Sequence, residues 1–506
     1  MYIVYNKGVQ FMKRILSLFT AIVLLLGLCA CGTAGEPAAD ATTTAPPAAT
    51  FKAGYGKADI TPQDSVPMNG YSSSSERMST GILSYIYSIA VAVQDADGNI
   101  AVVCSVDNAA VGEAICTEVR MWVVEKLGIP MENILIASIH QHSCPDPYNA
   151  AEPSSARYRT LLVEGIRKSI KQAVEDLKPA EMYINTATTE ALSFVRHYIA
   201  NDPAGSIVGD NYNDAIGAQY GYKGHESESD KEMRLVKFTR EGGNDIIMVN
   251  FQAHPHMGTS SADKNVHSDW PGVMRDTVTE KLGADCIYFS GAGGNLNSRS
   301  RISEENISVD FRDHGKRAAN YIVKAEDSYT KVNTGKVACK EITITYEADH
   351  SMDHLLPQAS LVTAARGRST AEAVELVKQY PELHSIYHAS AVVGKAAEGP
   401  TRDMIISVIT FGDVAFTVHP YEMFDTNGME LRAGSVGNEN YDADDQLANP
   451  FAMTFISTMG NGTHGYVPSR LGYTNGGYST DITKFAPGTG EQLVGDYLRL
   501  LNELHG

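Results

Sequence analysis

Short runs of apolar, often β-branched residues recur along the chain and predict buried β-strands. The runs occupy residues 86–93, 100–106, 134–139, 246–251, 286–289 and 414–418. Between them lie segments whose apolar residues recur every three or four positions, as on one face of an α-helix. These segments occupy residues 115–127, 162–177 and 274–282. The alternation predicts an α/β fold in which helices flank a mixed, largely buried β-sheet.

The first fifty residues lack this alternation. A basic pair precedes an apolar stretch that ends in Leu28-Cys29-Ala30-Cys31. This pattern predicts a bacterial lipoprotein signal peptide over residues 1–30. Cys31 would then be the lipidated residue that anchors the chain to the outer side of the cell membrane. An ordinary secretory signal or an uncleaved anchor is the alternative. Residues 31–50 are rich in Ala, Thr and Pro, so we expect a flexible tether there and a single large catalytic domain over 51–506.

The chain carries 41 Lys and Arg residues against 60 Asp and Glu residues, a net charge of −19 at pH 7. A negative surface repels phosphates, so nucleic acid is excluded as a partner, and lipid rather than charge would hold the protein at a membrane. The five cysteines after Cys31 include no Cys-x-x-Cys pair, which argues against a zinc ribbon and a disulfide scaffold. Cys104 and Cys286 lie in apolar runs and are expected to be buried.

Polar side chains that can carry chemistry follow several of the predicted strands directly. They are His140 and His142, His254, Asn295 and Asn297, and Glu422. Because ligands of open α/β sheets bind beyond the carboxyl ends of the strands, we expect these groups to share one site. His140 and His142 are two residues apart, so both side chains leave their strand on the same side.

His140, His254 and Glu422 have the composition of a catalytic zinc site, in which nitrogen and oxygen ligands leave one position open for water. Zn²⁺ lowers the pKa of that water to roughly 7 and polarises a carbonyl or phosphoryl oxygen. The sequence therefore predicts Zn²⁺ as the cofactor. His142 is either a direct catalytic contact or a supporting histidine.

Other polar groups have simpler interpretations. Asp269 is most simply a helix N-cap, and His256 and His267 are most simply loop residues. The glycine-rich stretch Gly291–Gly294 lacks the lysine of a P-loop, so we interpret it as a tight turn and not as a nucleotide site.

Several motifs follow one another in a characteristic order from about residue 53 onward. They are Gly54–Pro62, Ser105–Asp107, Ser138–Ser143, Asn250–Pro255, Ser268–Gly272, Gly291–Asn297, Gly465–Pro468 and Gly476–Tyr478. In their residues and their order these motifs resemble those of the neutral/alkaline (non-lysosomal) ceramidase family. The resemblance implies a zinc amidase whose metal is held by His140, His254, Glu422 and a tyrosine. That tyrosine matches Tyr466, with His464 as the alternative, and His142 would contact the substrate or the oxyanion.

The chain departs from the family pattern in three places. Asn297 stands where the family has a catalytic serine in Gly-Asp-x-Ser-Pro-Asn, and Ser298 is one position off. The segment His419–Glu422 differs from the more usual Pro-Gly-Glu around the glutamate. The sequence ends soon after Gly476–Tyr478, so we expect no C-terminal immunoglobulin-like domain. Ceramide cleavage therefore does not follow from the resemblance alone.

The resulting hypothesis is a lipid-anchored zinc hydrolase that cleaves an amide, with an N-acyl lipid or an ester among the candidate substrates. His142 and Asn297 would stabilise the tetrahedral oxyanion, and Asp269 would orient a ligand histidine. One alternative is a metal-dependent phosphoester or sulfoester hydrolase. Another is a non-catalytic lipoprotein that binds a ligand at a relict site, which the missing serine would favour.

Overall fold

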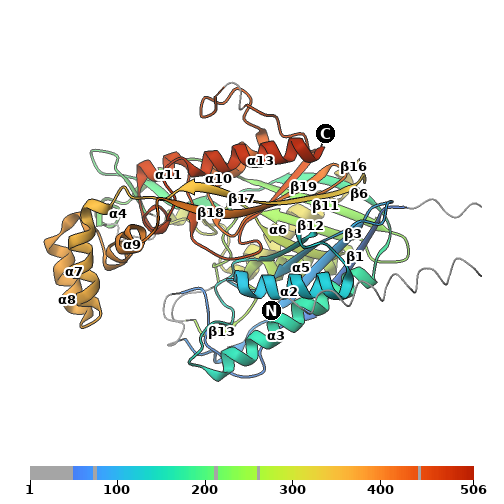
Figure 1. Cartoon of the computed structure of the whole chain (residues 1–506), viewed down its shortest axis with the longest axis horizontal. Coiled ribbons are helices and arrows are strands. Elements are labelled where there is room, and N and C mark those ends of the chain that lie inside the picture. Colours follow the sequence, from blue (N-terminus) through green and yellow to red (C-terminus); the bar gives the residue numbers. More distant parts are fainter. Residues whose placement is uncertain (1–49, 72–76, 210–214, 259–262, 443–445, 506) are drawn as a thin grey trace, which may run out of the picture. The chain divides into compact units, whose positions relative to one another are not determined.

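Two β-sheets pack face to face at the centre of the fold (Figure 1). The computed structural model describes residues 50–71, 77–209, 215–258, 263–442 and 446–505, so the predicted signal peptide and nearly all of the tether lie outside the described residues. The larger sheet has the strand order β14 (Asp285–Ser290), β12 (Ile246–Phe251), β11 (Glu232–Arg240), β6 (Lys178–Thr188), β1 (Lys52–Asp59), β3 (Tyr87–Gln94), β4 (Ile100–Val106) and β5 (Ile134–Ser138), with β16 (Thr330–Val332) beside β6. The smaller sheet has the order β17 (Val337–Glu347), β18 (Thr401–Phe411), β19 (Val414–Val418) and β21 (Met453–Ser457).

Both faces of the larger sheet are apolar, which explains its unbroken apolar runs. In β12, Ile246 and Met248 belong to the core shared with the smaller sheet, whereas Ile247 and Val249 belong to the core under the helices. This is the period-two alternation of a strand buried on both sides. The predicted α/β class is confirmed, but a second sheet and not a helix layer covers one face.

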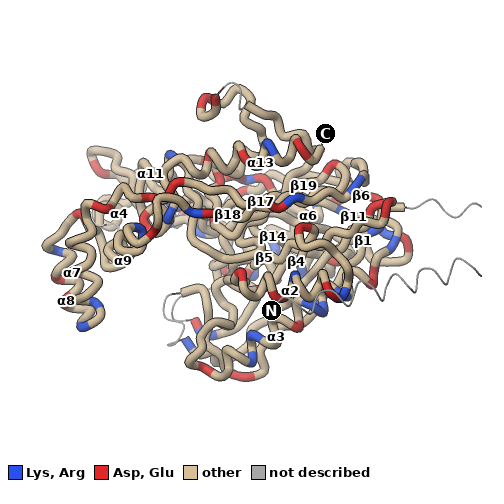
Figure 2. The backbone as a smooth tube through the Cα atoms, in the orientation of Figure 1, with Lys and Arg blue, Asp and Glu red and all other residues tan. Residues whose placement is uncertain are grey.

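Helices form the two outer layers. On the larger sheet lie α2 (Glu113–Leu127), α3 (Pro153–Glu175), α5 (Asp269–Leu282) and α6 (Phe311–Lys324). On the smaller sheet lie α10 (Asp425–Ala433) and α13 (Thr489–His505). Charged side chains are frequent along α3 and absent from β4 and β5 (Figure 2), as expected for an outer helix and two buried strands. Cys104 and Cys286 are buried as predicted, and the five cysteines in the described ranges are unpaired.

Shorter elements complete the fold. Small sheets pair β8 (His197–Ala200) with β9 (Ile207–Gly209) and β10 (Tyr222–His225), β2 (Gly81–Ile82) with β13 (Asn265–Val266), β7 (Phe194–Val195) with β15 (Leu296–Asn297), and β20 (Glu422–Met423) with β22 (Tyr466–Val467). Helices α7 (Leu356–Arg366), α8 (Thr370–Gln379) and α9 (Ile386–Ala396) enclose a small core of their own, and α4 (Ala215–Tyr220), α11 (Arg470–Asn475) and α12 (Tyr478–Ile482) are short. Within the described ranges, no helix combines the length and apolarity needed to cross a membrane.

The two ends of the larger sheet approach each other. Its halves join through only two residue pairs between β1 and β6. At the opposite side, the Ser105 hydroxyl of β4 donates to the Tyr288 carbonyl of β14, and Ser290 Oγ donates to Ile139 O at 2.7 Å. The carboxyl ends of β5 and β14 therefore lie together, and Thr458 Oγ1, just after β21, reaches Gly291 O at 3.0 Å. This junction of strand ends contains the candidate site.

Candidate metal centre and active site

His140 leaves β5 in a strained backbone conformation. Its φ of 63° lies in the left-handed region, which costs a non-glycine residue energy and is common at functional sites. Its Nδ1 lies 2.8 Å from Ala109 O. Because a carbonyl only accepts, Nδ1 carries the proton, and the lone pair of Nε2 is directed to the other side. The backbone thus prepares this ring as a ligand.

Three imidazoles and one carboxylate meet at the strand ends. The ligand atoms of His140, His142 and His254 lie within 4.8 Å of one another. His254 Nε2 is 3.0 Å from His142 Nε2, and His140 Nε2 is 3.5 Å from Glu422 Oε1. Zinc bonds of 2.0–2.1 Å in a tetrahedron separate ligand atoms by about 3.3 Å, so both distances are close to those of a zinc site.

The surroundings also suit a metal ion. A cavity of about 20 Å³ is lined by His140, His254 and Glu422, which is room for one water-sized body. Burial lowers the pKa of His142 and of His254 well below the ordinary value, with the neighbouring imidazoles acting in the same direction. Both rings are therefore neutral near pH 7, which is the form that binds metals. The residues present fit a zinc ion.

Tyr466 lies beside Glu422 on the neighbouring strand. The two residues are direct partners in the parallel pairing of β20 with β22. Burial and the Glu422 carboxylate raise the pKa of Tyr466 well above 10, while Arg196 opposes the shift. The alternative ligand, His464, packs on Tyr421 at 5.1 Å and lines a different cavity of about 450 Å³. Of the two candidates, Tyr466 is the one on the strand that pairs with Glu422.

Asn297 is at the edge of the histidine cluster. His256 Nε2 lies 3.2 Å from Asn297 Oδ1, and the His256 ring centre is 4.5 Å from that of His254. Burial lowers the pKa of His256 to about 4, so its Nε2 can donate as a neutral ring. The sequence-based interpretation of His256 as a simple loop residue did not include its contact with Asn297. Ser298 donates its hydroxyl to the His254 carbonyl and is buried.

Asp269 holds the backbone around the site. It is the first residue of α5, is fully buried and has a φ of 48°. Its Oδ2 accepts from Gly258 N at 2.8 Å and its Oδ1 from Trp270 N at 2.7 Å. Within the described part of the chain, the hydrogen bonds of this carboxylate go to backbone amides and not to the ring of His140, His142 or His254. Burial raises the pKa of Asp269.

Sequence reasoning missed Arg196. The side chain is buried, its Nη2 donates to Gly294 O at 2.5 Å and to the Ser479 hydroxyl, and its guanidinium lies 5.4 Å from the centre of the Tyr466 ring. A buried cation at this place favours negative charge on groups nearby. It follows the short strand β7, which has no apolar pattern, so only its charge marks it in the sequence.

The segment Gly291–Gly294 contains glycines where its backbone lies against the backbones of Gln252 and Glu422. A Cβ on Gly293 would lie 2.2 Å from Gln252 O, and one on Gly294 would lie 2.6 Å from Glu422 O. Only glycine permits such approaches. The segments that carry His254, Asn297 and Glu422 are therefore in direct backbone contact.

Comparisons with known proteins agree with the overall fold. Two solved structures, "Ceramidase complexed with C2" and a neutral ceramidase from Pseudomonas aeruginosa, match with TM-scores of 0.65 and 0.64. Each is 18% identical, and each match covers 90% of this chain and 75% of the other, which confirms the fold. Residues 51–286 match the family model described as neutral/alkaline non-lysosomal ceramidase, N-terminal. The predicted resemblance to the neutral/alkaline non-lysosomal ceramidase family is therefore confirmed over this segment.

Proposed function

We propose that the protein is a zinc-dependent hydrolase of an amide bond, with N-acyl lipids and esters as the substrate classes to examine. The observation that supports it is the cluster of three imidazoles at the strand ends, where His140, His254 and Glu422 line one water-sized cavity. His140, His254 and Glu422 would hold the ion, with Tyr466 as the further ligand. Bound zinc supplies Lewis acidity toward a carbonyl oxygen and lowers the pKa of water.

The chain's own residues would orient the substrate and stabilise charge. Asn297 Oδ1 accepts from His256, which leaves the carboxamide nitrogen to donate toward a developing oxyanion. His142 is proposed to contact the same oxyanion, from its position next to His254. Asp269 would fix the loop that carries His254 and His256, through Gly258. Water would attack the carbonyl directly, because an asparagine is no nucleophile and Asn297 is proposed to occupy the position of the family's serine.

The test combines metal analysis with a substrate panel. The purified chain is assayed on N-acyl amides and esters of graded chain length, before and after chelation, and its metal content is measured. We expect about one zinc per chain and activity that is lost on chelation, restored by zinc and absent in His140→Ala. The exposed His354→Ala is the matched control. Activity that survives both chelation and His140→Ala overturns the proposal.

Two other outcomes would identify the alternatives. Two metal ions per chain with turnover of phosphoesters or sulfoesters would indicate that hydrolase class. One zinc without turnover on any panel would indicate a ligand-binding protein.

We also propose that Cys31 carries a lipid that anchors the protein at the outer side of a cell membrane. The support is the sequence pattern around Leu28–Cys31. Metabolic labelling with a fatty acid should mark the wild type and the Cys29→Ser control but not Cys31→Ser. Equal labelling of Cys31→Ser would contradict the anchor.

A further inference from the structure

A pair of side chains fastens the glycine-rich segment to the segment that carries Glu422. Asn295 Nδ2 donates to Asp425 Oδ1 at 2.7 Å, and Asp425 N donates to Asn295 Oδ1 at 2.9 Å. Next to this pair, Gly294 N donates to Met423 O at 2.8 Å. Asn295 is 4% exposed and Asp425 is fully buried. Three hydrogen bonds therefore join the two segments in the interior.

Each residue of the pair is close in the sequence to a candidate site residue. Asn295 is two residues before Asn297, and Asp425 is three residues after Glu422. The distance between these functional side chains depends on how the two segments are joined. A misplacement of about 1 Å at such a site can cost roughly 100-fold in rate.

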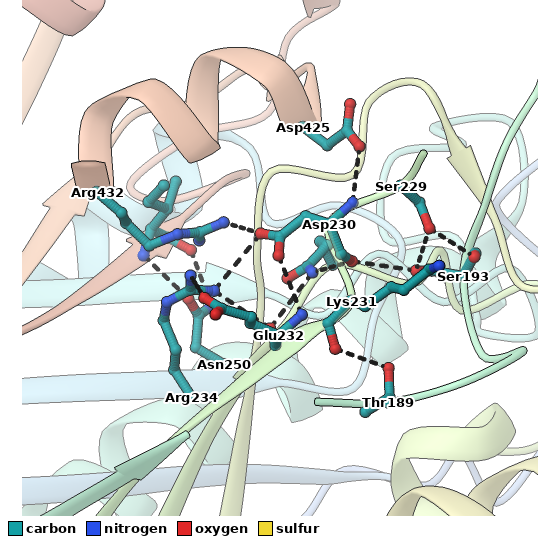
Figure 3. A network of polar contacts seen from close by, with 12 residues as sticks. Thr189, Ser193, Ser229, Asp230, Lys231, Glu232, Arg234, Asn250, Asp425 and Arg432 are labelled. Carbon is teal, nitrogen blue, oxygen red and sulfur yellow. Dashed lines mark hydrogen bonds and ion pairs between the residues drawn. The ribbon is translucent and has the colours of Figure 1, made fainter. Parts of the chain in front are cut away.

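The second oxygen of Asp425 reaches a third segment. Asp425 Oδ2 accepts from Asp230 N at 3.1 Å, as Figure 3 shows. The Asp230 carbonyl accepts from the side chain of Gln252, two residues before His254. The Asp230 carboxylate forms ion pairs with Arg432 and, at 3.5 Å, with Arg234 (Figure 3). Asp425 is thus connected to the three segments that carry Asn297, Glu422 and His254.

We propose that Asp425 is a positioning residue of the active site, which sets the relative placement of Asn297, Glu422 and His254. The inference rests on the proposed function and deepens it. Asp425 presents acceptors alone to the donors Asn295 Nδ2 and Asp230 N, so each bond is satisfied. An asparagine at 425 would place its own donor against one of these donors and leave a buried group unpaired.

The same geometry predicts that exchanging the two side chains preserves every bond. With Asn295→Asp and Asp425→Asn together, the new carboxylate at 295 accepts from the backbone N and the side-chain amide of residue 425. The new amide oxygen at 425 accepts from Asp230 N. Each single variant instead places two donors, or two carboxylates, face to face.

The experiment compares wild type, both single variants and the double variant as full-length chains. Hydrogen–deuterium exchange of the peptide containing residues 291–297 reports the attachment directly, and kcat and KM report its effect on hydrolysis. We expect each single variant to exchange at least 10-fold faster and to lose 10- to 100-fold in kcat with little change in KM. The double variant should return to within about threefold of wild type in both. Asp97→Asn, whose side chain is 65% exposed, is the matched control.

The outcomes separate this inference from the proposed function. If the wild type hydrolyses nothing, the proposed function fails, but the exchange data still test the attachment. The inference is overturned if Asp425→Asn exchanges like wild type, or if the double variant is no better than either single variant.

Discussion

Replacing Gly294 by alanine tests whether close backbone contact sets the geometry of the site. The added Cβ would lie 2.6 Å from Glu422 O and 2.9 Å from Met423 O. To reach ordinary contact at 3.4 Å, β20 has to move by about 0.8 Å, and Glu422 moves with it. Overpacking of this kind costs about 1–3 kcal/mol of stability, and a displacement near 1 Å costs roughly 100-fold in rate.

The assay measures kcat/KM on the best substrate of the panel together with the free energy of unfolding in urea. Gly394→Ala is the matched control, because nothing lies within 4 Å of a Cβ there and the position is in the last turn of α9. That control should be stabilised by about 0.5–1 kcal/mol with unchanged activity. A Gly294→Ala enzyme with wild-type kcat/KM would refute the reasoning.

Three further predictions concern buried ionisable side chains. Arg275→Ala should lower the free energy of unfolding in urea by about 3–5 kcal/mol, because it leaves the buried carboxylate of Asp107 without its partner. In the wild type, Arg275 Nη1 and Nη2 donate to Asp107 Oδ1 and Oδ2 at 2.7 and 2.6 Å. A loss below about 1 kcal/mol would contradict this prediction. Burial lowers the pKa of His314 from 6.5 to about 3, so the unfolded chain binds this proton first and stability falls as the pH drops below 6.5. Between pH 7 and pH 5, His314→Phe should therefore lose about 2 kcal/mol less stability than wild type, and equal losses would contradict this cause. Arg196→Met should lower kcat by about 100-fold with the fold intact by circular dichroism, and unchanged kcat would exclude a role in stabilising charge.

Much of the fold followed from local pattern. The apolar run before His140 and the run before His254 are strands whose carboxyl ends meet, so the common location of these residues was predictable from strand-end position alone. The second sheet was not predictable, because Ile246 and Met248 are equally apolar whether they face a sheet or a helix.

The parts of the site that escaped prediction depend on tertiary contact. His256 and Arg196 lie outside the long apolar runs, and their roles arise only when Asn297 and Tyr466 come beside them. The joining of Asn295 to Asp425 spans 130 residues, so no local pattern carries it. The glycine-rich segment was predicted as a tight turn, but the reason for its glycines, contact with the Glu422 backbone, became visible only in the fold.

The most direct measurement is anomalous X-ray diffraction at the zinc edge from crystals of the purified protein. We expect a single zinc ion bonded to His140 Nε2, His254 and Glu422 at about 2.0–2.2 Å, with Tyr466 as the further ligand and one position open to water. An anomalous peak elsewhere, or no zinc at this junction of strand ends in protein that hydrolyses its substrate, would contradict it.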